Sequence, residues 1–438
     1  MVIADTILRQ REKEGKPVRV AIVGAGVTGR MIALQLLTPV PGIRVSVIAN
    51  RTREKAERAF AAGGVDGPAF ARSLEELEES IERGQHTVIT DAFLACRASN
   101  IDVIVEVTGT IEFAAHVATE ALHHRKHVVL VNAELDSTLG PILKVHADRA
   151  GVVITNTDGD EPGVAMTLLR YLRSIGLTPV AAGNLKGMID FYRTPETQRA
   201  FAEKYNQDPV KVTSFADGTK LSMEATILAN AAGFKVGKRG MYGPKCAHVS
   251  EMAGLLPPAQ MLLTGLVDYA LGAAPHTGAF VIVHEDNPAK RRELGYYKMG
   301  DGPFFVFHTP YHLPHIQVAS TIARAALFGD ATVAPLGPPL VEVITLAKRD
   351  LRAGEVLDGV GGFLAYGVIE NTEVARREAL LPMGLGEGCR LTRNITRDQA
   401  LRIEDVERPE GRLCDLLWSE QCARFGASTP AGRGEPRS

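Results

Sequence analysis

The chain has 438 residues, of which 45% are hydrophobic and 23% are charged, and its formal net charge is −2. This length exceeds a single ordinary core and predicts about two or three globular domains. Acidic and basic residues are mixed throughout, which argues against nucleic-acid binding and against a membrane surface. Five cysteines without a Cys-x-x-Cys pair argue against a disulfide framework or a structural zinc site. Residues 1–8 lack a signal-peptide core and no apolar run is long enough to span a bilayer, so we expect a cytoplasmic protein.

The first motif is glycine-rich and stands between an apolar run at 18–23 and an apolar-periodic segment at 30–37. A strand, Gly-x-Gly-x-x-Gly and a helix in this order are typical of a dinucleotide-binding site. The first glycine permits the tight turn, the second lets backbone approach a pyrophosphate, and the third allows close helix–strand packing. The alternative is a glycine-rich turn without a ligand. We predict that the cofactor is bound by Gly24, Gly26, Val27, Thr28 and Gly29.

The residues after the next apolar run, 43–49, indicate which nucleotide binds. NAD-binding folds usually place an acidic residue at the end of this strand, where it accepts a hydrogen bond from the ribose 2′-OH. Here neutral Asn50 is followed by Arg51, whose guanidinium can pair with a 2′-phosphate. We predict that both residues bind the cofactor and that it is NADP(H). The alternative is a solvated charged run that opens a helix at 52–62.

Strand-like runs alternate with helical segments as far as residue 160, which predicts an α/β domain with a Rossmann-type doubly wound parallel sheet over residues 1–160. Ligands bind at the carboxyl ends of such strands. Two of these ends carry polar or glycine residues, namely Thr108-Gly109 and Asn132. We predict that these three residues lie near the nicotinamide. Thr108 and Asn132 are also good helix caps, and the two roles are compatible.

Beyond residue 160 the pattern changes. Residues 161–335 read as an α+β domain for substrate binding, catalysis and dimerisation, and prolines 335, 338 and 339 mark a linker. Residues 340–420 predict a small β-rich module. The Gly/Pro/Arg/Ser-rich end, 426–438, predicts a flexible tail.

Three carboxylates gather in Asp158-Gly159-Asp160-Glu161, at the junction of the first two predicted domains. Carboxylates at this density repel one another unless a cation or basic side chains balance them, and oxygen ligands suit Mg²⁺ or Mn²⁺. We therefore take Asp160 and Glu161 as candidate metal ligands. The alternative is a pair of turns carrying solvated acids.

Two lysines are candidate catalytic groups. Lys186 follows a strand-like run, and a buried lysine can donate a proton to a carbonyl undergoing reduction. If Asp217 caps the next helix, Lys220 and Glu224 share one face at spacing i, i+4. That spacing also describes an ordinary surface ion pair.

Two loops punctuated by glycine and proline lie near residues 296–303 and 309–315. Their aromatic and basic side chains suit a sugar phosphate, and Arg324 on the following helix suits a bidentate anion contact. We take Tyr311, His312 and Arg324 as candidate substrate contacts. His312 and His315 also have the chemistry of metal ligands, although turn and core histidines are commoner.

The order of these motifs resembles the homoserine dehydrogenase superfamily, through residues 24–29, 105–109, 131–133 and 217–220. More closely, the chain resembles the 1-deoxy-D-xylulose 5-phosphate reductoisomerase-like proteins of some bacteria. The matching segments there are 3–5, 159–163, 217–220 and 310–313. The C-terminal module resembles the SAF domain of sialic-acid synthases and antifreeze proteins, through residues 349–351 and 393–395.

This resemblance implies an NADPH-dependent enzyme of isoprenoid precursor synthesis. It would isomerise the carbon skeleton of 1-deoxy-D-xylulose 5-phosphate and reduce the aldehyde formed to 2-C-methyl-D-erythritol 4-phosphate. Lys186, Lys220, Asp217 and Glu161 are then the catalytic candidates, with a divalent cation as Lewis acid. However, the Asp-x-Glu metal motif of conventional reductoisomerases is missing from the substrate region, since Asp405-Val406-Glu407 lies in the terminal module. The superfamily also implies a homodimer, because its substrate domains commonly pair through their sheets.

Two other functions stay open. One is a plain NADP-dependent dehydrogenase that acts on homoserine, a polyol or a sugar acid. The other is a non-catalytic nucleotide-sensing regulator, since SAF modules also occur in pilus and flagellar chaperones.

Overall fold

The computed structural model describes residues 4–38 and 40–426, so the predicted tail lies, apart from Gly426, outside the described residues. Within these ranges the first part of the chain forms a seven-stranded parallel sheet in the order β3-β4-β2-β1-β5-β6-β7. Its strands are β1 (Val18–Val23), β2 (Ile43–Ala49), β3 (Ala69–Phe70), β4 (Thr87–Ile89), β5 (Val103–Glu106), β6 (His127–Leu130) and β7 (Ile154–Asn156). This topology confirms the predicted Rossmann-type α/β fold.

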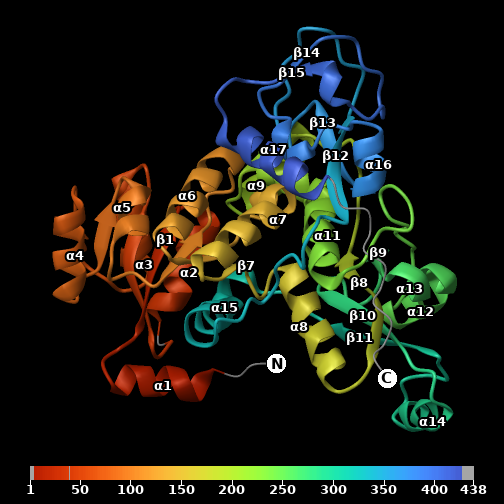
Figure 1. The fold of residues 1–438 in the computed structure, drawn as a ribbon, viewed down its shortest axis with the longest axis horizontal. Helices are drawn as coiled ribbons and strands as arrows, with labels where there is room; N and C mark the ends of the chain where they lie inside the picture. Colours follow the sequence, from red (N-terminus) through yellow and green to blue (C-terminus); the bar gives the residue numbers. More distant parts are fainter. Residues whose placement is uncertain (1–3, 39, 427–438) are drawn as a thin grey trace.

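Helices cover this sheet (Figure 1). They are α1 (Asp5–Lys13), α2 (Val27–Leu37), α3 (Arg53–Ala62), α4 (Leu74–Glu82), α5 (Ala92–Arg97), α6 (Ile111–His123) and α7 (Ala133–Ala150). Helix α7 begins directly after Asn132, whose side chain accepts a hydrogen bond from the Leu135 backbone N–H at 3.0 Å. Glu134 and Asp136 in the first turn also favour this start, since they complement the helix dipole.

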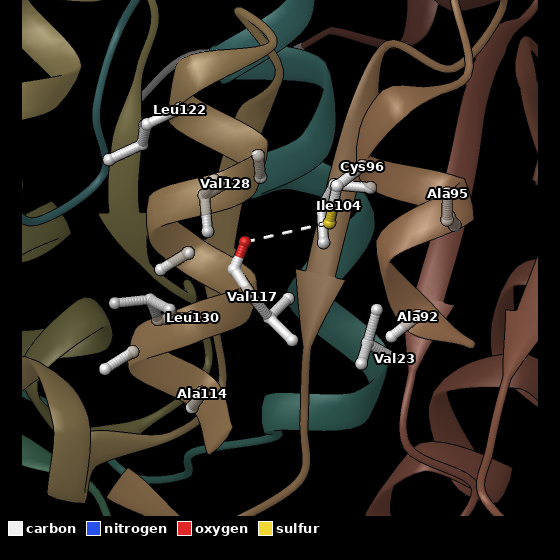
Figure 2. Packing of buried hydrophobic residues seen from close by; sticks show 14 of the residues in the cluster. Val23, Ala92, Ala95, Cys96, Ile104, Ala114, Val117, Leu122, Val128 and Leu130 are labelled. Carbon is white, nitrogen blue, oxygen red and sulfur yellow. Dashed lines mark hydrogen bonds between the residues drawn. The ribbon is translucent and has the colours of Figure 1, made fainter. Parts of the chain in front are cut away.

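Apolar side chains fill the space between the sheet and helices α5 and α6 (Figure 2). The Cys96 thiol lies in this cluster and donates to the Val117 carbonyl at 3.7 Å. Burial raises the pKa of Cys96 to about 12, so this cysteine is an inert core residue.

The second part of the chain forms a mixed sheet in the order β11-β10-β8-β9, in which β8 and β9 are parallel. The strands are β8 (Thr178–Lys186), β9 (Leu266–Leu271), β10 (Ala279–His284) and β11 (Phe304–Thr309). The helices are α8 (Glu161–Ser174), α9 (Pro195–Lys204), α10 (Pro209–Ala216), α11 (Thr219–Ala232), η1 (Val249–Glu251), α12 (Met252–Leu255), α13 (Pro258–Thr264), α14 (Pro288–Tyr296) and α15 (Pro314–Phe328). This arrangement places the carboxyl end of β8, with Lys186, beside α8 and α11.

From the sequence we considered Asp217 as the cap of this helix, but α11 begins at Thr219. Gly218 is its N-cap and adopts φ +80°, a left-handed conformation that favours glycine, while Asp217 ends the preceding helix. Asp217 therefore does not cap α11; its side chain is fully buried next to the start of this helix.

The last part of the chain forms two small antiparallel sheets. It comprises β12 (Val341–Ala347), β13 (Ala365–Asn371), α16 (Thr372–Arg377), η2 (Met383–Leu385), β14 (Arg390–Leu391), η3 (Ile403–Asp405), β15 (Val406–Glu407) and α17 (Leu413–Phe425). We call residues 341–407 the C-terminal module. It sits above α11 in Figure 1, and the Thr219 hydroxyl accepts a hydrogen bond from Gly367 N–H at 2.8 Å.

Two late helices return to the first sheet. Val318 and Ile322 of α15 pack in the same apolar cluster as Ile32 of α2. The N–H groups of Leu413 and Cys414, at the start of α17, donate to the Glu112 carboxylate of α6 at 2.8 and 2.9 Å. Helices α15 and α17, which follow the mixed sheet in the chain, thus pack against the helices of the first sheet.

No helix within residues 4–38 and 40–426 combines the length and apolarity needed to cross a bilayer.

A buried ion pair joins the C-terminal module to the residues before α11. Lys348 Nζ lies 2.7 Å from Asp217 Oδ2, and the two side chains are 2% and 0% exposed. Lys348→Met leaves the Asp217 charge buried without its partner, so we expect a loss of about 3–5 kcal/mol in the free energy of unfolding. Urea denaturation measures this loss. The matched control is Arg83→Met, which breaks the exposed pair with Glu79 (68% and 62% exposed) and should cost less than about 1 kcal/mol. Equal effects of the two substitutions would contradict a structural role for the buried pair.

Candidate active site

The glycine-rich turn has the geometry expected of a phosphate-binding loop. A Cβ added to Gly29 would meet the Gly24 carbonyl oxygen at 2.0 Å, so only glycine fits this helix–strand contact. A Cβ on Gly26 would meet nothing within 4 Å, so the backbone here is open to a ligand. Asn50 fixes the turn, because its side-chain oxygen accepts from Ala25 N–H at 3.0 Å.

A cavity of about 550 Å³ opens beside this turn, at the carboxyl ends of the parallel strands. Its lining includes five residues predicted to bind the cofactor, and these are Gly24, Gly26, Asn50, Arg51 and Thr108. Lys55 and Asp91 also line it, although the sequence had not pointed to them. Among the described residues neither Arg51 nor Lys55 makes an ion pair. Both therefore have the charge to hold an anion in the cavity.

The other predicted cofactor residues lie close to the cavity but outside its lining. Val27 and Thr28 form the first turn of α2, and Gly109 adopts φ +72° in the turn after β5. Asn132 is buried and caps α7, while its side-chain N–H donates to the Thr110 carbonyl at 2.9 Å. Asn132 thus caps α7 and also stands just after the end of β6, as the sequence had allowed.

Glu106, at the end of β5, was missed as a site residue. It is fully buried and accepts hydrogen bonds from the backbone N–H and the hydroxyl of Thr108, while its Oε2 has no partner among the described residues. Burial raises the pKa of Glu106 to about 7. The sequence signal that could have identified this position is an acidic residue at the end of a strand, two residues before Thr108-Gly109.

The second group of site residues is a buried cluster of charges that we call the lysine–carboxylate centre: Glu134, Asp160, Glu161, Lys186, Lys220 and Glu224. Lys186 Nζ donates to Glu161 Oε2 at 2.5 Å and to Glu224 Oε2 at 3.3 Å. Burial alone would lower the pKa of Lys186, but the two carboxylates raise it above its ordinary range. Lys186 therefore stays charged throughout the physiological range.

Lys220 is the second buried cation of the centre. Its Nζ lies 3.8 Å from Glu134 Oε1, in the first turn of α7. Burial opposes its charge, yet Glu134, Asp160 and Glu224 together raise the pKa of Lys220. Because α7 follows directly from the end of β6, this contact places the centre at the dinucleotide-binding edge of the parallel sheet.

Glu224 is the last member of the centre, and Asn184 contacts the centre from outside it. Of these two residues, the sequence pointed only to Glu224, through its i, i+4 spacing from Lys220. Asn184 Nδ2 donates to Glu161 Oε2 at 2.7 Å and to Glu224 Oε2 at 3.2 Å. Burial and the neighbouring Glu161 raise the pKa of Glu224 to about 8, although Lys186 opposes the shift. Glu224 therefore keeps its proton near neutral pH.

His312 reaches the same centre from the loop before α15. Its Nδ1 lies 3.8 Å from Glu161 Oε1 and 2.8 Å from the Thr277 hydroxyl. Burial lowers the pKa of His312, so the ring is neutral near pH 7. The neighbouring Tyr311 is half-exposed at the rim.

Two predicted site residues have other partners in the structure. Arg324 is buried, and its guanidinium makes two hydrogen bonds to Asp330 Oδ2, at 3.0 and 2.7 Å, so it is not available to a substrate anion. Asp217 pairs with Lys348 and accepts from Thr219 N–H at 2.9 Å. It therefore supports α11 rather than the reacting groups.

The carboxylates predicted to bind a metal are used differently. Glu161 is engaged by Lys186 and Asn184, and Asp160 is buried and faces Lys220. Within residues 4–38 and 40–426 no group of three or more His, Cys, Asp or Glu side chains is placed to hold a metal ion. Ammonium groups thus balance the acids that the sequence had assigned to a divalent cation, and this donor set does not fit one.

Two family models match the chain. Residues 24–155 match the NAD binding domain of homoserine dehydrogenase, and residues 159–318 match the catalytic domain of oxidoreductase DRL. These matches identify an NAD(P)-binding oxidoreductase and cover both the glycine-rich turn and most of the lysine–carboxylate centre. The C-terminal module lies outside both matched ranges, so its SAF-like character stays a prediction. No curated protein sequence matches the chain.

Solved structures with a similar fold are distant. An NAD binding oxidoreductase from Klebsiella pneumoniae shares 15% identity with a TM-score of 0.29, and the alignment covers 40% of this chain and only 44% of that one. The putative oxidoreductase yvaA from Bacillus subtilis shares 13% identity over 72% of this chain and 90% of that chain, with a TM-score of 0.37. A probable dehydrogenase from Thermotoga maritima shares 12% identity over 73% and 90%, with a TM-score of 0.41. At these TM-scores the structures support no particular reaction.

The raised pKa of Glu224 makes protein stability depend on pH. The native protein keeps this proton up to about pH 8, whereas the unfolded chain releases it near the ordinary value of 4.5. The native state therefore binds more protons between these values, and the stability that this proton contributes falls as the pH rises. We expect the free energy of unfolding of the wild type to fall relative to that of Glu224→Gln, by up to about 1.4 kcal/mol per pH unit. Urea denaturation at a series of pH values checks this, and the exposed Glu79→Gln variant should follow the wild type.

Proposed function

We propose that the chain is an NADPH-dependent reductoisomerase that converts 1-deoxy-D-xylulose 5-phosphate to 2-C-methyl-D-erythritol 4-phosphate. The observation that carries the proposal is the lysine–carboxylate centre, in which Lys186 and Lys220 lie among acids at the dinucleotide-binding edge of the sheet. The match of residues 159–318 to the oxidoreductase DRL catalytic domain supports it. So does the resemblance to reductoisomerase-like proteins that the sequence motifs carry.

The proposed reaction has two stages. The carbon skeleton first rearranges to an aldehyde without a net change in oxidation state. When bound, NADPH would supply the hydride that reduces the aldehyde carbon and would leave as NADP⁺, while a proton from the site goes to the aldehyde oxygen. Both stages develop negative charge on oxygen. Ammonium groups that are already in position stabilise this charge as it forms.

Lys186 and Lys220 are therefore assigned to the developing oxyanions. Glu224 is suited to hold the proton that is moved, because its pKa is raised to about 8 and lies close to the working pH. His312, whose Nδ1 lies 3.8 Å from Glu161 Oε1, and its neighbour Tyr311 are assigned to the substrate. Since the donor set does not fit a divalent cation, no step is assigned to a metal.

A simpler NADP-dependent dehydrogenase of homoserine, a polyol or a sugar acid is the second candidate. It is favoured by the match of residues 24–155 to the homoserine dehydrogenase NAD binding domain. It would use the same lysines as proton donors to a single carbonyl. A non-catalytic regulator is not carried forward, because the second match is to a catalytic domain.

The cavity beside the glycine-rich turn supports NADP(H) over NAD(H). Arg51 and Lys55 line it without an ion pair among the described residues, and Asn50 stands where NAD-binding folds usually carry an acid. A 2′-phosphate between the two cations would gain charge-assisted hydrogen bonds.

The substrate assignment is tested by following NADPH oxidation with 1-deoxy-D-xylulose 5-phosphate and identifying the product. We expect 2-C-methyl-D-erythritol 4-phosphate, with turnover retained after metal ions are removed with EDTA. Lys186→Met and Lys220→Met should each lower kcat/KM by about 100-fold or more, because each removes an oxyanion-stabilising charge. Lys204→Met, on the exposed face of α9, is the matched control. Turnover of homoserine or a polyol instead would select the second candidate, and a strict need for a divalent cation would refute the role given to the lysines.

Cofactor choice is tested with Arg51→Ala. Loss of the guanidinium should weaken NADPH binding by about tenfold or more and leave NADH binding nearly unchanged, since only NADPH carries the 2′-phosphate. Fluorescence titration of the reduced cofactor measures both dissociation constants. Equal weakening of NADPH and NADH binding would show that Arg51 does not read the 2′-phosphate.

A further inference from the structure

We propose that Lys211 binds the cofactor and that its ammonium group contacts the diphosphate of the dinucleotide. Lys211 belongs to residues 159–318, which match the DRL catalytic domain and which we call the catalytic half of the chain. The proposal rests on the dinucleotide site but not on the identity of the substrate. Lys211 lies outside residues 24–155, which match the NAD binding domain, so neither the match nor the sequence motifs point to it.

The position of Lys211 carries the proposal. Its Nζ lies 3.4 Å from the Thr28 hydroxyl, which belongs to the first turn of α2, directly after Gly26. The diphosphate of a dinucleotide binds at this turn, where free backbone N–H groups and the helix dipole favour an anion. The first turn of α2 contains no acidic residue that would compete for these groups. An ammonium ion held over this turn therefore adds a third source of positive charge at the same point.

Lys211 is exposed, and its ammonium group is free to bind an anion. Lys186, Lys220 and Lys348 each pair with a carboxylate, whereas Lys211 makes no ion pair among the described residues. The charged groups that face it are Lys220, Glu134, Asp160 and Asp208. Although the residue as a whole is exposed, neighbouring protein atoms shield part of its side chain from water, and this shielding and the positive charge of Lys220 lower the pKa of Lys211.

The local fold fixes where Lys211 stands. The Asp208 side chain accepts from Val210 N–H at 2.8 Å and starts α10 at Pro209, so Lys211 lies in the first turn of this helix. Through Lys220 and Asp160 the same side chain is in the electrostatic field of the lysine–carboxylate centre. Neutralising Lys211 with a diphosphate would remove a positive charge that acts on Lys220. Cofactor binding is in this way coupled to the centre that handles the substrate.

The test measures binding without turnover. The variants are Lys211→Met and Lys211→Arg, with Lys204→Met on the neighbouring exposed helix as the matched control. The probes are NADPH, which has the diphosphate, and adenosine 2′-monophosphate, which lacks it. We expect Lys211→Met to weaken NADPH binding by about tenfold or more and to leave adenosine 2′-monophosphate binding unchanged. Lys211→Arg should stay within about threefold of the wild type, because it keeps the charge.

Two results would overturn the proposal. The first is wild-type NADPH affinity in Lys211→Met; a raised KM for the phosphorylated substrate beside it would assign Lys211 to the substrate phosphate. The second is equal weakening of both probes, which would indicate general disruption of the site. Because NADPH affinity is measured without a substrate, failure of the reductoisomerase assay would leave this test intact.

Discussion

The balance of charge in the lysine–carboxylate centre is the constraint on which the rest of the site depends. Lys220 is buried and the Lys186 side chain is only 20% exposed, and an unpaired ammonium ion so far from water is too costly to keep. Glu161 and Glu134 offset that cost by direct contact. Because Glu224 holds a proton near neutral pH, the centre carries less negative charge than its four carboxyl groups would otherwise give it. Removing one member therefore changes the charge state of its neighbours as well as the contact itself.

Such a centre works only if the elements that carry it stay in place, and the C-terminal module provides much of that support. Lys348 pairs with Asp217 beneath α11, and the same ammonium group donates to the Arg193 carbonyl at 2.8 Å. The hydroxyl groups of Tyr192 and Tyr366 both donate to Asp398, at 2.9 and 3.0 Å. Residues 191–193 follow Lys186 in the chain, so the module holds both lysine-bearing segments. A role in positioning the site accounts for a module that contributes no residue to the centre itself.

The sequence predicted what local pattern determines. Strands β1 and β2 and the glycine-rich turn lie where their apolar runs and glycines had placed them. It also selected Lys186, Lys220 and Glu161, which the structure brings together, because charged residues at strand ends and helix starts face the cleft of an α/β fold. It could not show that Asp217 pairs with Lys348, because Lys348 lies 131 residues further along the chain. It also gave Arg324 to the substrate, although the partner of this arginine, Asp330, lies only six residues away. Lys211 was missed because Thr28 lies 183 residues earlier in the chain.

Two lysines of the catalytic half reach the edge of the parallel sheet, and their partners differ in a way that matters for binding. Lys220 lies near a carboxylate, Glu134, whereas the partner of Lys211 within residues 4–38 and 40–426 is the hydroxyl of Thr28. A hydroxyl is a weaker partner for an ammonium ion than a charged group is. An arriving anion would therefore displace the Thr28 contact easily and leave the Lys220 pair intact. Of these two cations, one is thus held by a carboxylate and the other only by a hydroxyl group beside the glycine-rich turn.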